Sequence, residues 1–183
     1  MMTVDLAGNG NPLEWLLERL DDQASFLAEL GEDLLVSTKQ RFVTTTAPDG
    51  TPWAPNTPLT LAQYAAKLTG SSLRKKDGSL TTKGETRLAS KKPGTGETRM
   101  LGERIDYLVQ QDDLVVGSPM IYAGTFQFGA KSGEFGFGLY NDRVGSFPIP
   151  WGDIPARAFL GLSDADRQTI ADLWQTYLLP PPN

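Results

Sequence analysis

The chain has 183 residues, 39% of them hydrophobic, and a formal charge of −5, which together suit one domain with a sizeable core. It contains neither cysteine nor histidine, so the composition excludes disulfides, thiolate or imidazole metal sites and Ser-His-Asp chemistry. There is no run of about 18 apolar residues and no signal-peptide pattern at the N-terminus, so we expect a protein that is assembled in the cytoplasm without contacting a membrane.

The first predicted element is a long amphipathic helix. Asn11 is a suitable N-cap, Pro12 fits the first helical position, and Glu14 completes the capping pattern. Leucine and alanine then recur at spacings of three and four, which places them on one face. We expect helix as far as Thr44, with a possible break or bend at Gly31.

A proline-rich connector and a basic segment follow this helix. Residues 45–58 contain four prolines and predict turns around a buried Trp53, and residues 59–68 predict a short helix. Residues 70–99 contain eight basic and three acidic residues, so this segment carries +5 and the rest of the chain −10. The segment has no aromatic residue and little apolar surface to offset the entropy of ordering it, so we expect a long, flexible basic loop or arm.

Alternating apolar residues predict a β-hairpin next. Residues 105–109 and 114–117 have the alternation of half-buried strands, and residues 111–113 separate them as a turn. A further strand is predicted near residues 134–140, where aromatic residues alternate with glycines.

The last predicted element is a helix with a clear start. Pro155 holds the preceding chain extended, and Ser163 is a good N-cap. Acidic residues follow it, where the positive end of the helix dipole stabilises their charge. We interpret those acidic residues as a solvated, capped first turn. The prediction for 1–183 is a single α+β domain, with an antiparallel sheet packed against the long N-terminal helix and the C-terminal helix, and with 70–99 as a loop excursion.

Three motifs together resemble the phage virion morphogenesis family of tailed phages and Mu-like prophages. The segment 48–55, Pro-Asp-Gly-Thr-Pro-Trp-Ala-Pro, resembles the family's Gly-x-x-Trp-x-Pro-Leu segment. The segment 122–129, Tyr-Ala-Gly-Thr-Phe-Gln-Phe-Gly, resembles its Tyr-Ala-x-x-His-Gln-Phe-Gly box, with Phe126 in place of the histidine. The segment 154–167, which begins Ile-Pro-Ala-Arg-Ala-Phe-Leu-Gly, resembles its C-terminal signature, and the three occur in the family's order.

The resemblance implies a structural virion protein without catalytic, cofactor or metal sites. It implies a tail completion or terminator subunit that forms a ring, commonly a hexamer, at the head-proximal end of the tail. The implied partners are further copies of itself, the tail tube protein, a head-tail connector or stopper protein, and DNA that passes through the central channel without sequence recognition. The alternatives are a connector on the head side of the neck and a DNA-binding module.

Two groups of residues are the candidate sites. The proposed structural anchors are aromatic and apolar side chains of the motifs and of the last helix: Trp53, Tyr122, Phe128, Phe159, Leu173 and Trp174. The candidates for a subunit interface or a DNA-facing surface are basic: Arg74, Lys75, Lys76, Lys83, Lys91, Lys92 and Arg157. The sequence leaves open whether the basic segment meets DNA, meets an acidic neighbour or is only solvated, and whether Arg157 bridges subunits or binds carbonyls of its own chain.

Overall fold

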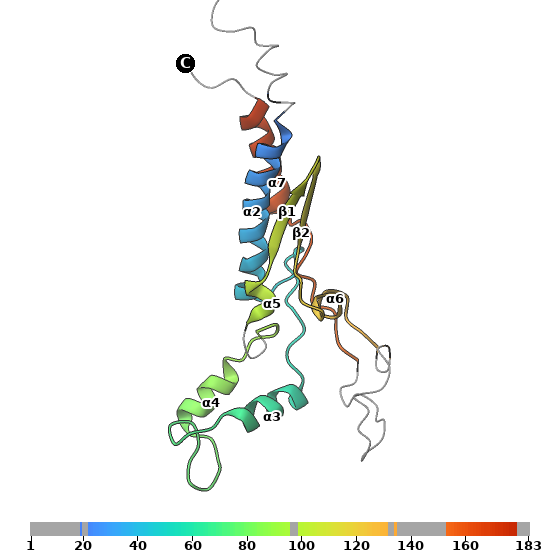
Figure 1. Ribbon diagram of the computed structural model, residues 1–183. Helices are drawn as coiled ribbons and strands as arrows, with labels where there is room; N and C mark the ends of the chain where they lie inside the picture. Colours follow the sequence, from blue (N-terminus) through green and yellow to red (C-terminus); the bar gives the residue numbers. More distant parts are fainter. Residues whose placement is uncertain (1–18, 20–21, 96–98, 132–133, 135–152, 179–183) are drawn as a thin grey trace, which may run out of the picture.

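The computed structural model describes residues 19, 22–95, 99–131, 134 and 153–178. The hairpin consists of β1 (Asp106–Gln110) and β2 (Asp113–Gly117), and it lies beside a long helix and a C-terminal helix (Figure 1). The helices are α2 (Gln23–Thr44), α3 (Pro58–Lys67), α4 (Thr82–Ala89), α5 (Met100–Glu103), α6 (Ala123–Phe128) and α7 (Asp164–Leu178). The α+β class is confirmed, while the strand predicted near 134–140 lies almost wholly outside the described residues.

Helix α2 reaches Thr44 as predicted, and it is unbroken at Gly31. It begins after its cap Asp22, whose side chain accepts a hydrogen bond from the Ser25 amide at 3.4 Å, so the helix is not continuous through Asp22; the start predicted at Asn11 lies outside the described residues. Gly31 is buried under the ring of Tyr107. A Cβ at this position would lie 2.4 Å from Cδ2 of the Tyr107 ring, so the glycine serves close packing and not a bend.

The hairpin packs one face on α2. Strands β1 and β2 are antiparallel, with Leu108 opposite Val115 and Gln110 opposite Asp113. Tyr107 and Val109 are half-buried on the face toward α2, whereas Leu108 and Val115 are 52% and 54% exposed. The alternation predicted from the sequence is confirmed, and it leaves an apolar pair on the outer face.

Two apolar clusters form the core of the body, which comprises α2, α5, the hairpin, α6, α7 and the motif segments packed against them. The upper cluster has buried Phe26, Leu30 and Tyr177, and the Phe26 and Trp174 rings lie 4.1 Å apart between centroids. The lower cluster consists of Trp53, Leu101, Ile105 and Phe159, with Phe42 and Phe126 packed against it. Helix α7 therefore covers α2 near its start, and the motif segments cover it near its end.

The segment that was predicted as a basic loop is partly helical. Thr81 caps α4 by accepting a hydrogen bond from the Gly84 amide at 3.2 Å, and Arg74 binds the carbonyls of Leu68 and Ala65 at 2.7 and 2.6 Å at the end of α3. The segment is therefore not a loop throughout, because capping and an arginine that satisfies helix carbonyls stabilise α4 where apolar contacts are few, while the flexibility of 70–99 stays a prediction. We call residues 58–90, with α3 and α4, the lobe; in Figure 1 they lie below the body.

The two ends of the lobe meet. Nδ2 of Asn56, just before α3, donates to the Lys91 carbonyl at 3.0 Å, just after α4. The lobe is thus an insertion between two neighbouring points of the chain. Across the described residues, no helix is both long and apolar enough to cross a membrane.

Candidate functional site: a polar network joining the three motifs

The C-terminal motif enters the core as extended chain. Ile154 pairs with Ala130 in an isolated antiparallel bridge, and the chain from Pro155 to Phe159 has no regular secondary structure. Buried backbone outside helices and sheets needs other hydrogen-bond partners. Side chains from α2, from the connector and from α6 supply them.

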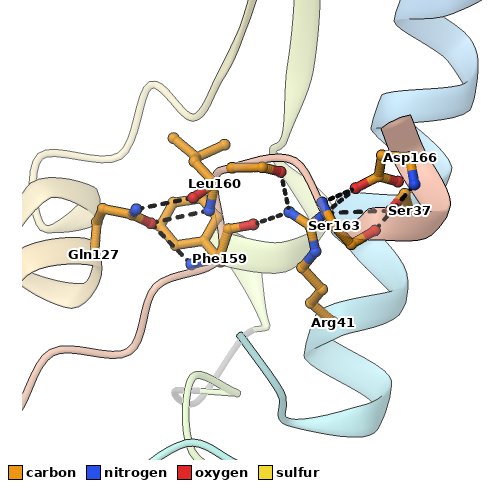
Figure 2. A network of polar contacts seen from close by, with 8 residues as sticks. Ser37, Arg41, Gln127, Phe159, Leu160, Ser163 and Asp166 are labelled. Carbon is orange, nitrogen blue, oxygen red and sulfur yellow. Dashed lines mark hydrogen bonds and ion pairs between the residues drawn. The ribbon is translucent and has the colours of Figure 1, made fainter. Parts of the chain in front are cut away.

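The side chain of Gln127 hydrogen-bonds the backbone of the C-terminal motif, as a neighbouring strand would. Its Oε1 accepts from the amides of Phe159 and Leu160 at 2.8 and 2.9 Å, and its Nε2 donates to the Leu160 carbonyl at 3.0 Å (Figure 2). One side-chain amide thereby satisfies three backbone groups and fixes α6 against the motif.

Arg41 forms the other half of the network. Nη1 donates to the carbonyls of Phe159 at 2.7 Å and Gly161 at 2.9 Å, and Nη2 donates to Oδ2 of Asp166 at 2.5 Å (Figure 2). Arg41 is 5% and Asp166 6% exposed, so the ion pair is buried. It joins α2 to the motif and to the first turn of α7.

The ionisation of this pair follows from its surroundings. Burial alone would raise the pKa of Asp166, but hydrogen bonds from Ser37 and Ser163 and the charge of Arg41 together hold it below its usual value. Burial lowers the pKa of Arg41, and the neighbouring carboxylate opposes that shift. An arginine titrates so far above neutral pH that both groups stay charged there.

Asp166 also completes the cap of α7. Its Oδ2 accepts from the Ser163 amide at 2.7 Å, while Oγ of Ser163 accepts from the Asp166 amide at 3.1 Å. The predicted helix start at Asp164 is confirmed. The interpretation of this turn as solvated is wrong for Asp166, because its carboxylate turns inward to Arg41 as well as to the cap.

Arg157 and Trp53 tie the connector to the same segment. Nε and Nη2 of Arg157 donate to the carbonyls of Ala54 and Pro55 at 2.7 and 2.9 Å, and Nε1 of Trp53 donates to the Ala158 carbonyl at 2.8 Å. Arg157 is 8% exposed, and burial lowers its pKa. It is therefore not a surface residue of the subunit, because its guanidinium satisfies carbonyls within its own chain.

The anchors predicted from the sequence fall into two groups. Phe159 is fully buried, Trp53 is buried and Leu173 is half-buried against the upper cluster. Phe128, Tyr122 and Trp174 are 79%, 44% and 37% exposed. Phe128 and Tyr122 are thus not core anchors within one subunit. A short helix buries only one side, and in this motif that side carries Phe126 and Gln127. Trp174 packs one face on Phe26 at the edge of the core.

The basic candidate residues also fall into two groups, according to their contacts within the subunit. Arg74 satisfies carbonyls in the lobe, Lys92 donates to the Val43 carbonyl at 2.5 Å, and Nζ of Lys91 lies 4.7 Å from the centre of the Tyr64 ring. Lys75, Lys76 and Lys83 are exposed. Arg74, Lys91 and Lys92 therefore contact groups within the lobe or at its junction with α2. Lys75, Lys76 and Lys83 extend from the surface of the lobe.

A groove runs beside the network. It has a volume of about 680 Å³, and residues near or within all three motifs line it, among them Asn56, Tyr122, Phe126, Ile154 and Arg157. Arg157, which lines the groove, is engaged by its hydrogen bonds to the Ala54 and Pro55 carbonyls.

Arg41 and Gln127 were missed as key residues from sequence. Gln127 stands inside a recognised motif, but its partners lie 32 and 33 positions away. Arg41 follows Leu30, Leu34 and Thr38 at helical spacing, so it continues the inward face of α2. A basic residue on an inward face requires an acidic partner, which was the available signal.

Replacing Gln127 tests the network directly. Gln127→Leu keeps a similar volume but leaves two amides and one carbonyl without partners, and each such group costs about 1–3 kcal/mol. We expect the free energy of unfolding, measured by urea denaturation, to fall by at least about 2 kcal/mol. The control is Gln168→Leu on the exposed side of α7, where the change is expected to stay within about 0.5 kcal/mol. Equal effects would contradict the role of Gln127.

The sequence comparisons agree with the motifs. The model of the phage virion morphogenesis family matches residues 5–179. Searches of curated proteins and of solved structures found no significant match. The match spans nearly the whole chain and includes every segment of the polar network, so the chain belongs to the phage virion morphogenesis family and has a structural role in building the virion.

Proposed function

We propose that this protein is a tail completion or terminator subunit, which forms a ring at the head-proximal end of a phage tail and joins the tail to the head. Family membership supports a role in virion assembly, and this family is not a known enzyme class. The observation that carries the proposal is that the three family motifs meet at the buried start of the C-terminal motif. Arg41 and Gln127 bind its backbone, and hydrogen bonds of Trp53 and Arg157 join it to the first motif. These residues fix the fold, as a rigid building block requires.

The chemistry of the network also argues against a reactive centre. Its arginines, glutamine and aspartate are engaged with backbone groups or with each other. Among the described residues, Oγ of Ser118 is the buried side-chain polar atom that lacks a partner, and it lies outside the network. A building block with further copies, a tail tube protein and a connector or stopper as partners fits this arrangement.

Deletion of the gene tests the proposal. We expect lysates of the deletion strain to contain filled heads without tails, or tails of abnormal length, when viewed by electron microscopy. Complementation in trans with the intact gene should restore joined particles. A deletion strain that releases normal infectious particles would refute the assignment.

Cryo-electron microscopy of complete particles locates the protein. Under the proposal its density forms a ring on the last ring of the tail tube. Density on the head side would instead assign it to the connector or stopper layer, which is the alternative that the resemblance leaves open.

A further inference from the structure

A second cleft lies between the body and the lobe, and basic residues surround it. Its volume is about 940 Å³, and its basic lining residues are Lys39, Lys67, Arg87, Lys91, Lys92 and Arg99. Glu103 is the one carboxylate among the described lining residues. Phe42, Val43, Tyr64 and Leu68 supply apolar surface in the same cleft. We call this surface the basic cleft: it combines apolar side chains with a strong excess of positive charge.

The outer face of the hairpin has the opposite charge and the same mixed character. Leu108 and Val115 are directly opposite each other and more than half exposed. Asp106, Gln110 and Asp113 are exposed at alternate positions, so they share this face with the apolar pair. Neither strand contains a basic residue. We call these five residues the hairpin face.

We infer that the hairpin face of one subunit docks into the basic cleft of a second copy of this chain. The two surfaces match in charge and in apolar character, because carboxylates meet ammonium and guanidinium groups while Leu108 and Val115 meet the apolar residues of the cleft. A duplex phosphate backbone would use the charges alone and leave these apolar residues uncovered. The inference rests on the proposed function, since it names the contact by which subunits of a ring would join.

The placement of the two surfaces agrees with a head-to-tail contact. Tyr107 of the hairpin packs over Gly31, in the first half of α2, whereas Lys39, Phe42 and Val43 of the cleft belong to its last turns. The hairpin is not part of the cleft lining in its own subunit. Two different patches that complement each other form a heterologous interface, which generates a ring when the rotation closes.

Charge reversal with rescue tests this contact. The cleft variant is Lys39→Glu with Arg87→Glu, and the hairpin variant is Asp106→Lys with Asp113→Lys. The control, Lys75→Glu with Lys83→Glu, makes the same change of charge at exposed lobe residues that do not line the cleft. Association of the purified proteins is measured without DNA by sedimentation velocity, and circular dichroism checks that each variant is folded.

We expect wild type and control to assemble, and either variant to associate at least about tenfold more weakly, since two reversed pairs each change affinity by a factor of a few. Association of the wild type should weaken toward 1 M salt, where the Debye length is about 3 Å. Mixing the two variants should restore assembly, because each intact surface then finds an intact partner and the reversed surfaces also match.

Three outcomes would overturn the inference. They are a wild-type protein that stays monomeric, variants that assemble as well as the control, and a cleft variant that assembles normally but no longer binds a short DNA duplex in fluorescence anisotropy. The last would make DNA the occupant of the cleft. The deletion phenotype is scored independently, so each of these results leaves the proposed role in tail completion to its own test.

Discussion

Replacing Arg41 with alanine should destabilise the protein by about 3–5 kcal/mol, the usual effect of removing one partner from a buried ion pair. The variant leaves the Asp166 carboxylate without its cation and the carbonyls of Phe159 and Gly161 without donors. Urea denaturation followed by tryptophan fluorescence measures the loss. The matched control is Lys131→Ala, which removes a solvent-exposed ion pair with Asp153 and should change stability by less than about 1 kcal/mol.

The same pair predicts a response to acid. The folded-state pKa of Asp166 is lowered, so its contribution to stability is complete above the ordinary aspartate value of about 3.9 and is lost as the pH falls through the folded-state pKa. Asp166→Asn removes the titrating group. The drop in unfolding free energy from neutral pH into this acidic range should therefore be smaller in Asp166→Asn than in wild type. An identical drop in both proteins would show that Asp166 is not the linked group.

Phe159→Ala should have a comparable effect, a loss of about 3–5 kcal/mol, because it opens a cavity in the lower cluster. Phe159 is 0% exposed, and its ring lies 5.4 and 6.0 Å from the Phe42 and Phe126 rings between centroids. Phe159→Leu keeps more of the volume and should lose less. Thermal and urea denaturation provide the comparison.

Phe128→Ala is the control for Phe159→Ala. It removes the same kind of side chain from the end of α6, but Phe128 is 79% exposed, so the stability of the isolated subunit should change by about 0.5 kcal/mol or less. Equal losses for Phe128→Ala and Phe159→Ala would mean that the lower cluster is not the packed core described above.

The elements predicted well from the sequence are those specified by neighbouring residues. The Ser163 cap, the helix 59–68 and the alternation in the hairpin each depend on a few adjacent positions. Such local preferences can be judged without knowing what lies across the fold. Helix α4 is not evident from the sequence although Thr81 is a good cap, because its composition is weakly apolar and the carbonyls that Arg74 binds are known only from the fold.

The network itself could be predicted only in part. The three motifs pointed to its segments, but Arg41 and Asp166 lie 125 positions apart, and nothing local indicates that they meet. Gly31 illustrates the same limit: alone it resembles a helix breaker, and its purpose is visible only once Tyr107 is placed above it. Exposure of Phe128 likewise depends on which side of α6 faces the core.

The contact between Asn56 and Lys91 makes the lobe replaceable. Because the chain leaves and re-enters the body at nearly one point, the intervening residues can be exchanged for a short turn without stretching the backbone of the body. An insertion of this kind can change in length and charge without altering the network. The lobe is then a part of the molecule through which the same body can be adapted to a different neighbour.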